Sequence, residues 1–147
     1  MVKVKNVHLR FANFAIQDAS FHVKENEFFT ILGPSGSGKS CLLRTIVGMY
    51  KVNDGEIYIN NREVHNLPPE DRNIGFAMQD SALFPNLTVF GNIAFGLKIR
   101  KMDSQLIKKK VHEISELFHI THLLDRSVTK LSGGESQRIS FARALII

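Results

Sequence analysis

The N-terminal part of the chain alternates apolar and polar positions in short runs. Residues 2–9 alternate with one slip near Asn6, which predicts a strand with an irregularity at that point. Similar runs predict strands over residues 19–23 and 56–60, and Glu63–Val64 completes a small hairpin after a turn. The pattern therefore indicates short strands joined by turns.

Two further apolar runs are continuous rather than alternating. Residues 27–32 and 73–78 are short apolar segments bounded by turn residues, which predicts buried strands. The first run leads into a glycine-rich loop, and residues 41–47 beyond that loop have apolar positions three and four apart, as in a helix. The second run ends at Gln79.

The C-terminal half changes to a helical pattern. Residues 81–100 are apolar and aromatic with scattered Gly and Asn. Beyond them, apolar residues recur at intervals of four, three and four, which predicts a helix that Asp103 or Ser104 caps. Ser132 and Glu135 form an S-x-x-E capping box, so another helix should start at that point.

Length and composition indicate an ordinary globular protein. The chain has 147 residues, about one domain, and its 44% hydrophobic content is enough for a core. We find no apolar run of transmembrane length and no signal peptide at the N-terminus. The single cysteine, Cys41, excludes an internal disulfide, so we expect a protein of a reducing, intracellular compartment.

The formal net charge of +5 leaves nucleic-acid binding open as a function. The dense basic run, Lys108–Lys110, lies inside a predicted helix. A solvated helix face explains this run better, so we expect no nucleic-acid partner. A phosphate ligand or an acidic membrane surface is compatible with the mild positive charge.

One motif carries specific chemistry. It consists of Gly33, Pro34, Ser35, Gly36, Ser37, Gly38, Lys39 and Ser40, and it fits the phosphate-binding pattern G-x-x-x-x-G-K-[ST]. Its glycines allow positive φ, so that loop N–H groups can converge on phosphate oxygens beside a helix N-terminus. Lys39 would reach the outer phosphates, and the Ser40 hydroxyl would ligate Mg²⁺. A flexible surface turn is the alternative, which the predicted strand and helix on either side disfavour.

A second anion site is possible where the later helix begins. Gly133 and Gly134 lie at that exposed N-terminus, next to the capping box. Taken alone, however, these residues are explained better by a well-capped helix without any ligand.

Together these motifs resemble the ATP-binding subunit of ABC transporters. Leu131–Glu135 is similar to that family's signature motif, with Glu where Gln is usual, and the residues that follow also match the pattern. Gln79 resembles the glutamine of the family's Q-loop. Phe11 lies where the family has an aromatic residue that stacks on adenine. The resemblance runs from about residue 2 to the last residue.

The resemblance implies an α/β fold of the P-loop NTPase type. We expect an N-terminal antiparallel β subdomain with the P-loop core over residues 1–87. An inserted helical subdomain should cover residues 88–130, and residues 131–147 should hold the signature motif and its helix. The fold would be incomplete at its C-terminus, because the family's Walker B acids, D-loop and switch histidine do not occur in this sequence.

The resemblance also implies a mechanism with ATP and Mg²⁺. Lys39 and Gln79 would act in catalysis, and Ser40 and Gln79 would hold the metal ion. The residues implied in ATP binding are Phe11, Gly33, Pro34, Ser35, Gly36, Ser37, Gly38, Lys39, Ser40, Cys41, Ser132, Gly133, Gly134 and Glu135. Two copies would meet head to tail, with each ATP between the P-loop of one copy and the signature motif of the other.

The subfamily and the partner follow from two further stretches. Residues 68–75 and 82–89 resemble importer ATPases for sugars, polyamines and oxyanions such as molybdate, tungstate or sulfate. In such proteins the segment after the Q-loop contacts the transmembrane permease, so the subunit would be cytoplasmic and peripheral on the inner membrane face. Leu83, Phe84 and Phe90 are candidates for this surface, although each could equally be packed core.

Three functions remain open at this stage. The first is the energy-coupling subunit of an importer, the second a soluble ABC-type ATPase without a transport role, and the third a nucleotide-binding fragment without hydrolysis. Because the family's next strand, which carries the acids for phosphoryl transfer, is missing, we expect these 147 residues alone to fold poorly, bind ATP weakly and not hydrolyse it. The transported solute cannot be named, since the ATPase does not touch it.

Overall fold

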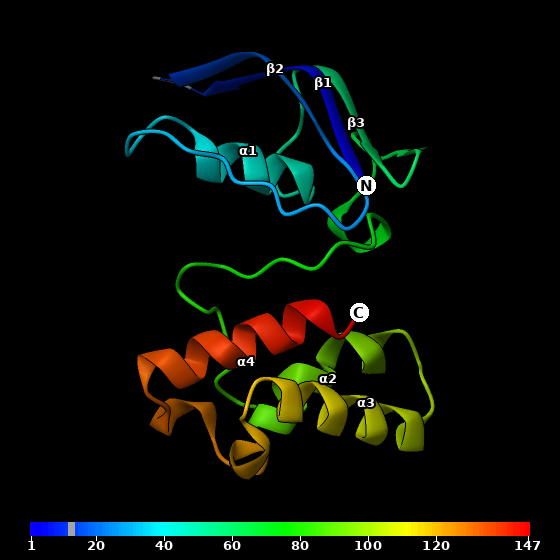
Figure 1. Ribbon diagram of the computed structural model, residues 1–147, viewed down its shortest axis with the longest axis vertical. Helices are drawn as coiled ribbons and strands as arrows, with labels where there is room; N and C mark the ends of the chain where they lie inside the picture. Colours follow the sequence, from blue (N-terminus) through cyan, green and yellow to red (C-terminus); the bar gives the residue numbers. More distant parts are fainter. Residues whose placement is uncertain (12–13) are drawn as a thin grey trace. The chain divides into compact units, whose positions relative to one another are not determined.

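The computed structural model describes residues 1–11 and 14–147 and divides into two compact units (Figure 1). The first unit spans Met1–Asn73 and the second spans Ile74–Ile147. The first contains a β-sheet and one α-helix, whereas the second is helical. The subdomain boundaries expected at residues 87 and 130 stay a prediction.

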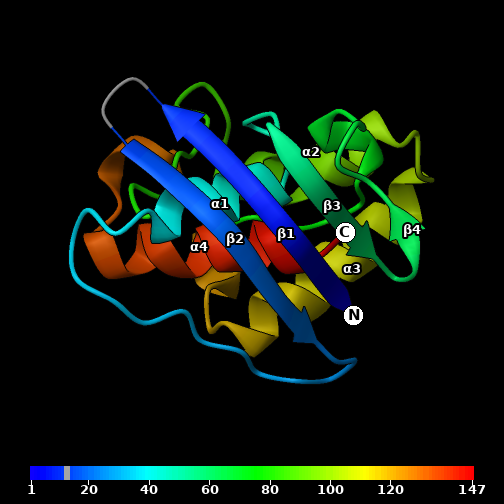
Figure 2. The same ribbon diagram turned by 90° about the horizontal axis from the view of Figure 1, so that it is seen from above.

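The first unit is built on an antiparallel sheet. Among the described residues four strands form it in the order β2-β1-β3-β4 (Figure 2). They are β1 (Val2–Phe11), β2 (Phe14–Val23), β3 (Asp54–Ile59) and the short β4 (Arg62–Glu63). The alternation of apolar and polar positions is thus confirmed as β-structure, and the hairpin of β3 and β4 as well.

The irregularity predicted near Asn6 is also confirmed. The pairing of β1 with β2 shifts register between Val4 and Val7, and Asn6 itself has a positive φ of 45°. The Asn6 N–H donates to Ser20 Oγ at 2.8 Å instead of to a ladder carbonyl. Gly55 of β3, at φ +96°, faces this bulge so closely that an added Cβ would collide with the Asn6 backbone.

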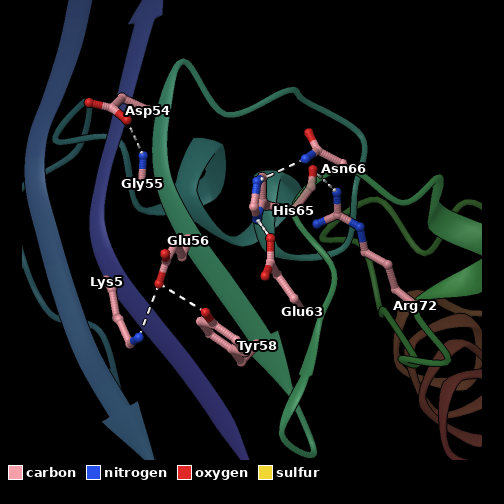
Figure 3. A network of polar contacts seen from close by, with 9 residues as sticks. All are labelled: Lys5, Asp54, Gly55, Glu56, Tyr58, Glu63, His65, Asn66 and Arg72. Atoms are coloured by element: carbon pink, nitrogen blue, oxygen red, sulfur yellow. Dashed lines mark hydrogen bonds and ion pairs between the residues drawn. The ribbon is translucent and has the colours of Figure 1, made fainter.

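A cross-strand polar cluster stabilises the pairing of β1 with β3 (Figure 3). The Glu56 carboxylate accepts hydrogen bonds from Lys5 Nζ and from the Tyr58 hydroxyl, each at 3.0 Å. The Lys5 ammonium also lies 4.6 Å from the centroid of the Tyr58 ring.

Helix α1 (Lys39–Ile46) packs under one face of this sheet (Figure 1). Its buried residues are Leu42, Thr45 and Ile46, which matches the apolar spacing predicted for residues 41–47. The buried Thr45 hydroxyl donates to the Cys41 carbonyl at 2.8 Å, so that burial leaves it satisfied.

The C-terminal end of α1 is held by a buried arginine. The guanidinium of Arg72 donates to the carbonyls of Thr45 (2.8 Å) and Ile46 (2.9 Å), which are among the last carbonyls of the helix. It also donates to the Leu67 carbonyl at 2.9 Å. A further hydrogen bond, also of 2.9 Å, joins it to the His65 carbonyl (Figure 3). Burial lowers the pKa of Arg72, but its charge still lies at the negative end of the helix dipole.

The buried strand predicted over residues 27–32 is wrong. These residues, all in the described part of the chain, form neither helix nor strand. Phe28 is 95% exposed and Leu32 is 86% exposed. An apolar run predicts a strand only where neighbouring strands supply hydrogen bonds, and no strand of the described residues pairs with this segment.

The strand predicted over residues 73–78 is wrong for a similar reason. This described segment is extended but unpaired, and it ends in a turn at Gln79 and Asp80. It runs close to the last helix of the second unit, because a Cβ added at Gly75 would collide with the carbonyl oxygen of Ala144. The apolar residues of this segment are thus half-buried without pairing in a sheet.

The second unit encloses its own apolar core. Its α-helices are α2 (Val89–Ile99), α3 (Ser104–Leu117) and α4 (Gly133–Leu145). The fully buried core side chains include Val89, Ile93, Leu97, Val111, Ile120, Leu123 and Ile139. The helix predicted near residue 103 is confirmed, and Asp103 caps it by accepting hydrogen bonds from the N–H groups of Gln105 and Leu106.

Short 3₁₀ helices complete the secondary structure. They are η1 (Pro69–Asp71), η2 (Thr121–Leu123) and η3 (Val128–Lys130). Within residues 1–11 and 14–147, no helix is both long and apolar enough to cross a lipid bilayer.

The hydrogen bonds of Arg72 to buried carbonyls predict a large loss of stability in Arg72→Met. The variant keeps an apolar stem but leaves several buried carbonyls without a donor, so we expect the free energy of unfolding to fall by about 3 kcal/mol or more. Urea unfolding of the chain measures it. The matched control is Arg62→Met, because Arg62 is exposed and makes one long hydrogen bond, of 3.3 Å to the Asp71 carbonyl. Equal losses in the two variants would contradict a stabilising role of the Arg72 hydrogen bonds.

Candidate functional site

The glycine-rich loop leads directly into α1. Gly36 and Gly38 have φ values of +82° and +91°, in the left-handed region that favours glycine. A Cβ added at Gly36 would meet no atom within 4 Å, whereas one at Gly38 would collide with the Phe14 ring of β2 and approach Ile16 Cδ1 to 2.9 Å. Gly38 therefore allows the loop to pack on the sheet, and Gly36 leaves the outer part of the loop open.

The Lys39 ammonium lies against this loop. Its Nζ donates to the carbonyls of Pro34 at 2.7 Å and Gly33 at 2.8 Å, and it lies 3.4 Å from Ser37 Oγ. These partners are neutral, so they leave the positive charge of the ammonium uncompensated. The loop thus holds a cation at its centre.

The start of α1 is left open for an anion. Among the residues that the structure describes, no side chain caps it, and its first turn contains no acidic residue. In contrast, Thr88, Asp103 and Ser132 cap α2, α3 and α4 with their own oxygens. The first amides of α1 and the positive end of its dipole therefore need a partner from elsewhere, such as a phosphate.

The remaining residues predicted in this loop are exposed or half-buried, and their role in ligand binding stays a prediction. Pro34, Ser35 and Ser40 are exposed, and Cys41 is half-buried in the first turn of α1. The Ser40 side chain is thus available as an oxygen ligand beside the loop.

Phe11 lies at the end of β1 in an aromatic cluster. Its ring centroid is 6.1 Å from that of Phe14 and 5.4 Å from that of Tyr50. The ring is half-buried. The sequence had singled out Phe11 but not its two aromatic neighbours, which are needed to hold the ring in place. Its role in stacking on a base stays a prediction.

The capping box at the start of α4 is confirmed. The Glu135 carboxylate accepts hydrogen bonds from the Ser132 N–H and the Ser132 hydroxyl, both at 2.7 Å, and the Glu135 N–H donates back to Ser132 Oγ at 3.3 Å. These hydrogen bonds hold the pKa of Glu135 below its ordinary value. A carboxylate that stays ionised compensates this helix end, so α4 offers a weaker anion site than α1. Gly133 and Gly134 are exposed beside it.

Gln79 and the start of α4 border the same hollow. Gln79 is exposed in a turn. The hollow has a volume of about 550 Å³, and its lining includes Gln79, Leu83, Pro85, Gly133, Ser136 and Gln137. The second unit thus brings Gln79 and the signature residues together, while Lys39 and Ser40 belong to the first unit.

The three candidates for a partner surface differ in burial. Phe84 is 38% exposed, with its ring centroid 4.4 Å from that of Phe95. Leu83 and Phe90 instead pack against the helical core. The packed-core alternative therefore describes Leu83 and Phe90, and Phe84 is the candidate that remains available to a partner.

Sequence reasoning missed one buried polar residue, Asn92, which holds this segment. Its Oδ1 accepts from the Phe84 N–H at 2.7 Å, and its Nδ2 donates to the carbonyls of Phe84 and Thr88, each at 3.1 Å. Asn92 has no exposed surface. An asparagine inside an apolar helical run was the available signal, since buried amides are normally hydrogen-bonded.

Comparison with known proteins gives consistent matches. The family model described as ABC transporter matches residues 16–147. The molybdate/tungstate import ATP-binding protein WtpC of Pyrococcus abyssi is 49% identical over 147 residues, and that of Methanocaldococcus jannaschii is 48% identical. The match covers all of this chain but only 43% and 49% of those two proteins, so the chain spans less than half of their length.

A solved structure shows the same fold. It is a dimeric ATP-binding cassette in a post-hydrolysis state, bound to ADP and Pi. It superposes with a TM-score of 0.85 at 32% sequence identity, over 99% of this chain and 69% of that chain. The sheet, the glycine-rich loop and the capped α4 are therefore parts of an ATP-binding cassette fold, and the chain belongs to the ABC transporter family as one of its ATP-binding proteins.

Proposed function

We propose that the chain binds ATP through residues 33–40 and that the complete protein uses ATP hydrolysis to drive solute transport through a partner permease. The observation that carries this proposal is the start of α1, where, among the described residues, no side chain caps the amides and the Lys39 ammonium lies against the loop carbonyls of Gly33 and Pro34. The first turn contains no acidic residue. A polyphosphate supplies the negative charge that this end of the helix lacks.

The residues present fit both ATP and Mg²⁺. The triphosphate is held by the loop amides, the Lys39 ammonium and the first turn of α1, while Phe11 provides an aromatic face for the base. The exposed Ser40 hydroxyl and the Gln79 side-chain oxygen are hard oxygen ligands of the kind that Mg²⁺ prefers. When bound, the metal ion would neutralise phosphate charge during transfer.

The two units have separate roles in this proposal. Lys39 neutralises phosphate charge, and Gln79 orients the attacking water. Two copies pair head to tail, and the segment of Ser132, Gly133, Gly134 and Glu135 in one copy faces the ATP held by the other. The dimeric solved cassette supports such a pairing. Because Glu135 is ionised and bound to Ser132, the amides and hydroxyl of this segment, and not its carboxylate, would meet the phosphate.

The permease side of the proposal rests on the segment after Gln79. Its exposed Phe84 would dock on the transmembrane subunit, which places the protein at the inner face of the membrane. The names of the two reported relatives support an oxyanion such as molybdate or tungstate as the transported solute. Selection of the solute would lie in the permease and its binding protein.

ATP binding should depend on Lys39. We expect Lys39→Met to weaken ATP binding at least about tenfold, because the loop loses its cation, while the fold is kept. Titration with Mg²⁺ and ATP, followed calorimetrically, measures the dissociation constant. Lys24→Met is the matched control, because Lys24 is an exposed lysine of the same unit. The Lys24→Met variant should bind ATP with unchanged affinity. Equal affinity in wild type and Lys39→Met would contradict the proposed site.

Turnover separates the transport ATPase from the alternative of nucleotide binding without hydrolysis. The complete protein should release phosphate from ATP, and Lys39→Met should abolish the release. Binding that depends on Lys39 without any turnover would support the alternative.

The two left-handed glycines should respond differently to alanine. Gly36→Ala costs about 1 kcal/mol of unfolding free energy, because the left-handed conformation is strained but the space is open. Gly38→Ala adds the collision with Phe14, so we expect at least about 1 kcal/mol more and a loss of ATP affinity. Thermal unfolding measures the loss of stability in the two variants. Equal losses would contradict the packing of Gly38 on the sheet.

A further inference from the structure

One side chain of α4 holds the segment that follows Gln79. Arg143 Nη1 donates to the Ala82 carbonyl at 2.9 Å, and Nη2 donates to the Ser81 carbonyl at 3.1 Å. The same guanidinium lies 5.3 Å from the centroid of the Phe84 ring. A planar fork that binds two carbonyls and stacks on a ring is a geometry that lysine cannot reproduce.

The backbone that Arg143 binds is in an unusual conformation. Ser81 and Ala82 have φ values of 60° and 39°, in the left-handed region that residues with a Cβ avoid. Such a conformation is strained and persists only where surrounding groups enforce it. Two carbonyls turned toward one guanidinium provide this enforcement.

The loop around Gln79 is attached to α4 on both sides. Before Gln79, Gly75 lies so close to the Ala144 carbonyl that no side chain fits between them. After Gln79, Ser81 and Ala82 are bound to Arg143, the neighbour of Ala144. Both attachments therefore reach the same turn of α4.

A second helix fixes the far end of the segment. Asn92 of α2 binds the main chain of Phe84 through both its N–H and its carbonyl. Residues 81–84 thus join the helical body at three points, which leaves Gln79 on a short loop between fixed ends.

We infer that Arg143 is a positioning residue that ties the Gln79 loop to α4, so that a displacement of the signature helix is passed to Gln79 and to Phe84. The α4 helix carries Ser132 and Glu135 at one end and Arg143 near the other, and it behaves as a rigid rod between them. The structural part of this inference stands on the contacts alone. The functional part rests on the proposed function.

Amide hydrogen exchange on the complete protein tests the structural part. In Arg143→Met the amides of Ser81, Ala82 and Phe84 should exchange at least tenfold faster, whereas core amides of α3 should keep their rates. Arg138→Met is the matched control, because it removes an exposed guanidinium from the same helix and should leave residues 81–84 unchanged. Unchanged exchange in Arg143→Met, or a uniform rise over the whole second unit, would overturn the inference.

Steady-state ATP turnover of the complete protein with its permease tests the functional part. Arg143→Met should lower kcat at least tenfold and leave KM for ATP within about twofold, because ATP binding belongs to the other unit. Arg143→Lys should restore only part of kcat and only part of the exchange protection. If Arg143→Met does not fold, the Arg143→Lys variant provides the test. Exchange rates and a kcat equal to those of the wild type in Arg143→Lys would overturn the inference.

The outcomes keep the two proposals apart. If Lys39→Met leaves ATP binding intact, the proposed function fails, while the exchange measurement still decides whether Arg143 holds the loop. If Lys39 controls binding but Arg143→Met raises KM and leaves kcat unchanged, the positioning role fails and the proposed function stands.

Discussion

The helix ends of this protein must each find a partner for their unpaired backbone groups, and the fold depends on how α1 meets this constraint. Its last carbonyls are bound by the buried Arg72, which also gathers the loop from His65 to Leu67. Its first amides have no side-chain cap. The helix is thus fixed at one end, and its other end, beside the glycine-rich loop, is where we propose that phosphate binds.

In the second unit, a long segment without regular secondary structure is held in place by side chains. Residues 74–87 of this unit form neither helix nor strand, so side chains must hold their main chain in place. Asn92 and Arg143 bind main-chain atoms of this segment from two helices. A segment held in this way keeps a defined shape while its outer side, with Phe84, stays accessible.

The sequence predicted those features that depend on neighbours along the chain. The alternation in β1, the cap of α3 by Asp103 and the box of Ser132 with Glu135 are local patterns, and all are confirmed. Arg72 and Arg143 were missed because each binds carbonyls far away along the chain. Those of Thr45 and Ile46 lie 27 and 26 residues from Arg72, and those of Ala82 and Ser81 lie 61 and 62 residues from Arg143. No periodicity records such distant contacts. Residues 27–32 were misjudged because an apolar run does not reveal whether a neighbouring strand exists.

Gly75 illustrates a requirement that differs from the usual one for glycine. Its φ is not in the left-handed region, so other residues could adopt its backbone conformation, but its α-carbon faces the Ala144 carbonyl with no room for a further atom. A methyl group would already force the two segments of the chain apart, and a larger side chain would add little further destabilisation. Tolerance to mutation at this position should therefore be all-or-none, with alanine nearly as damaging as leucine.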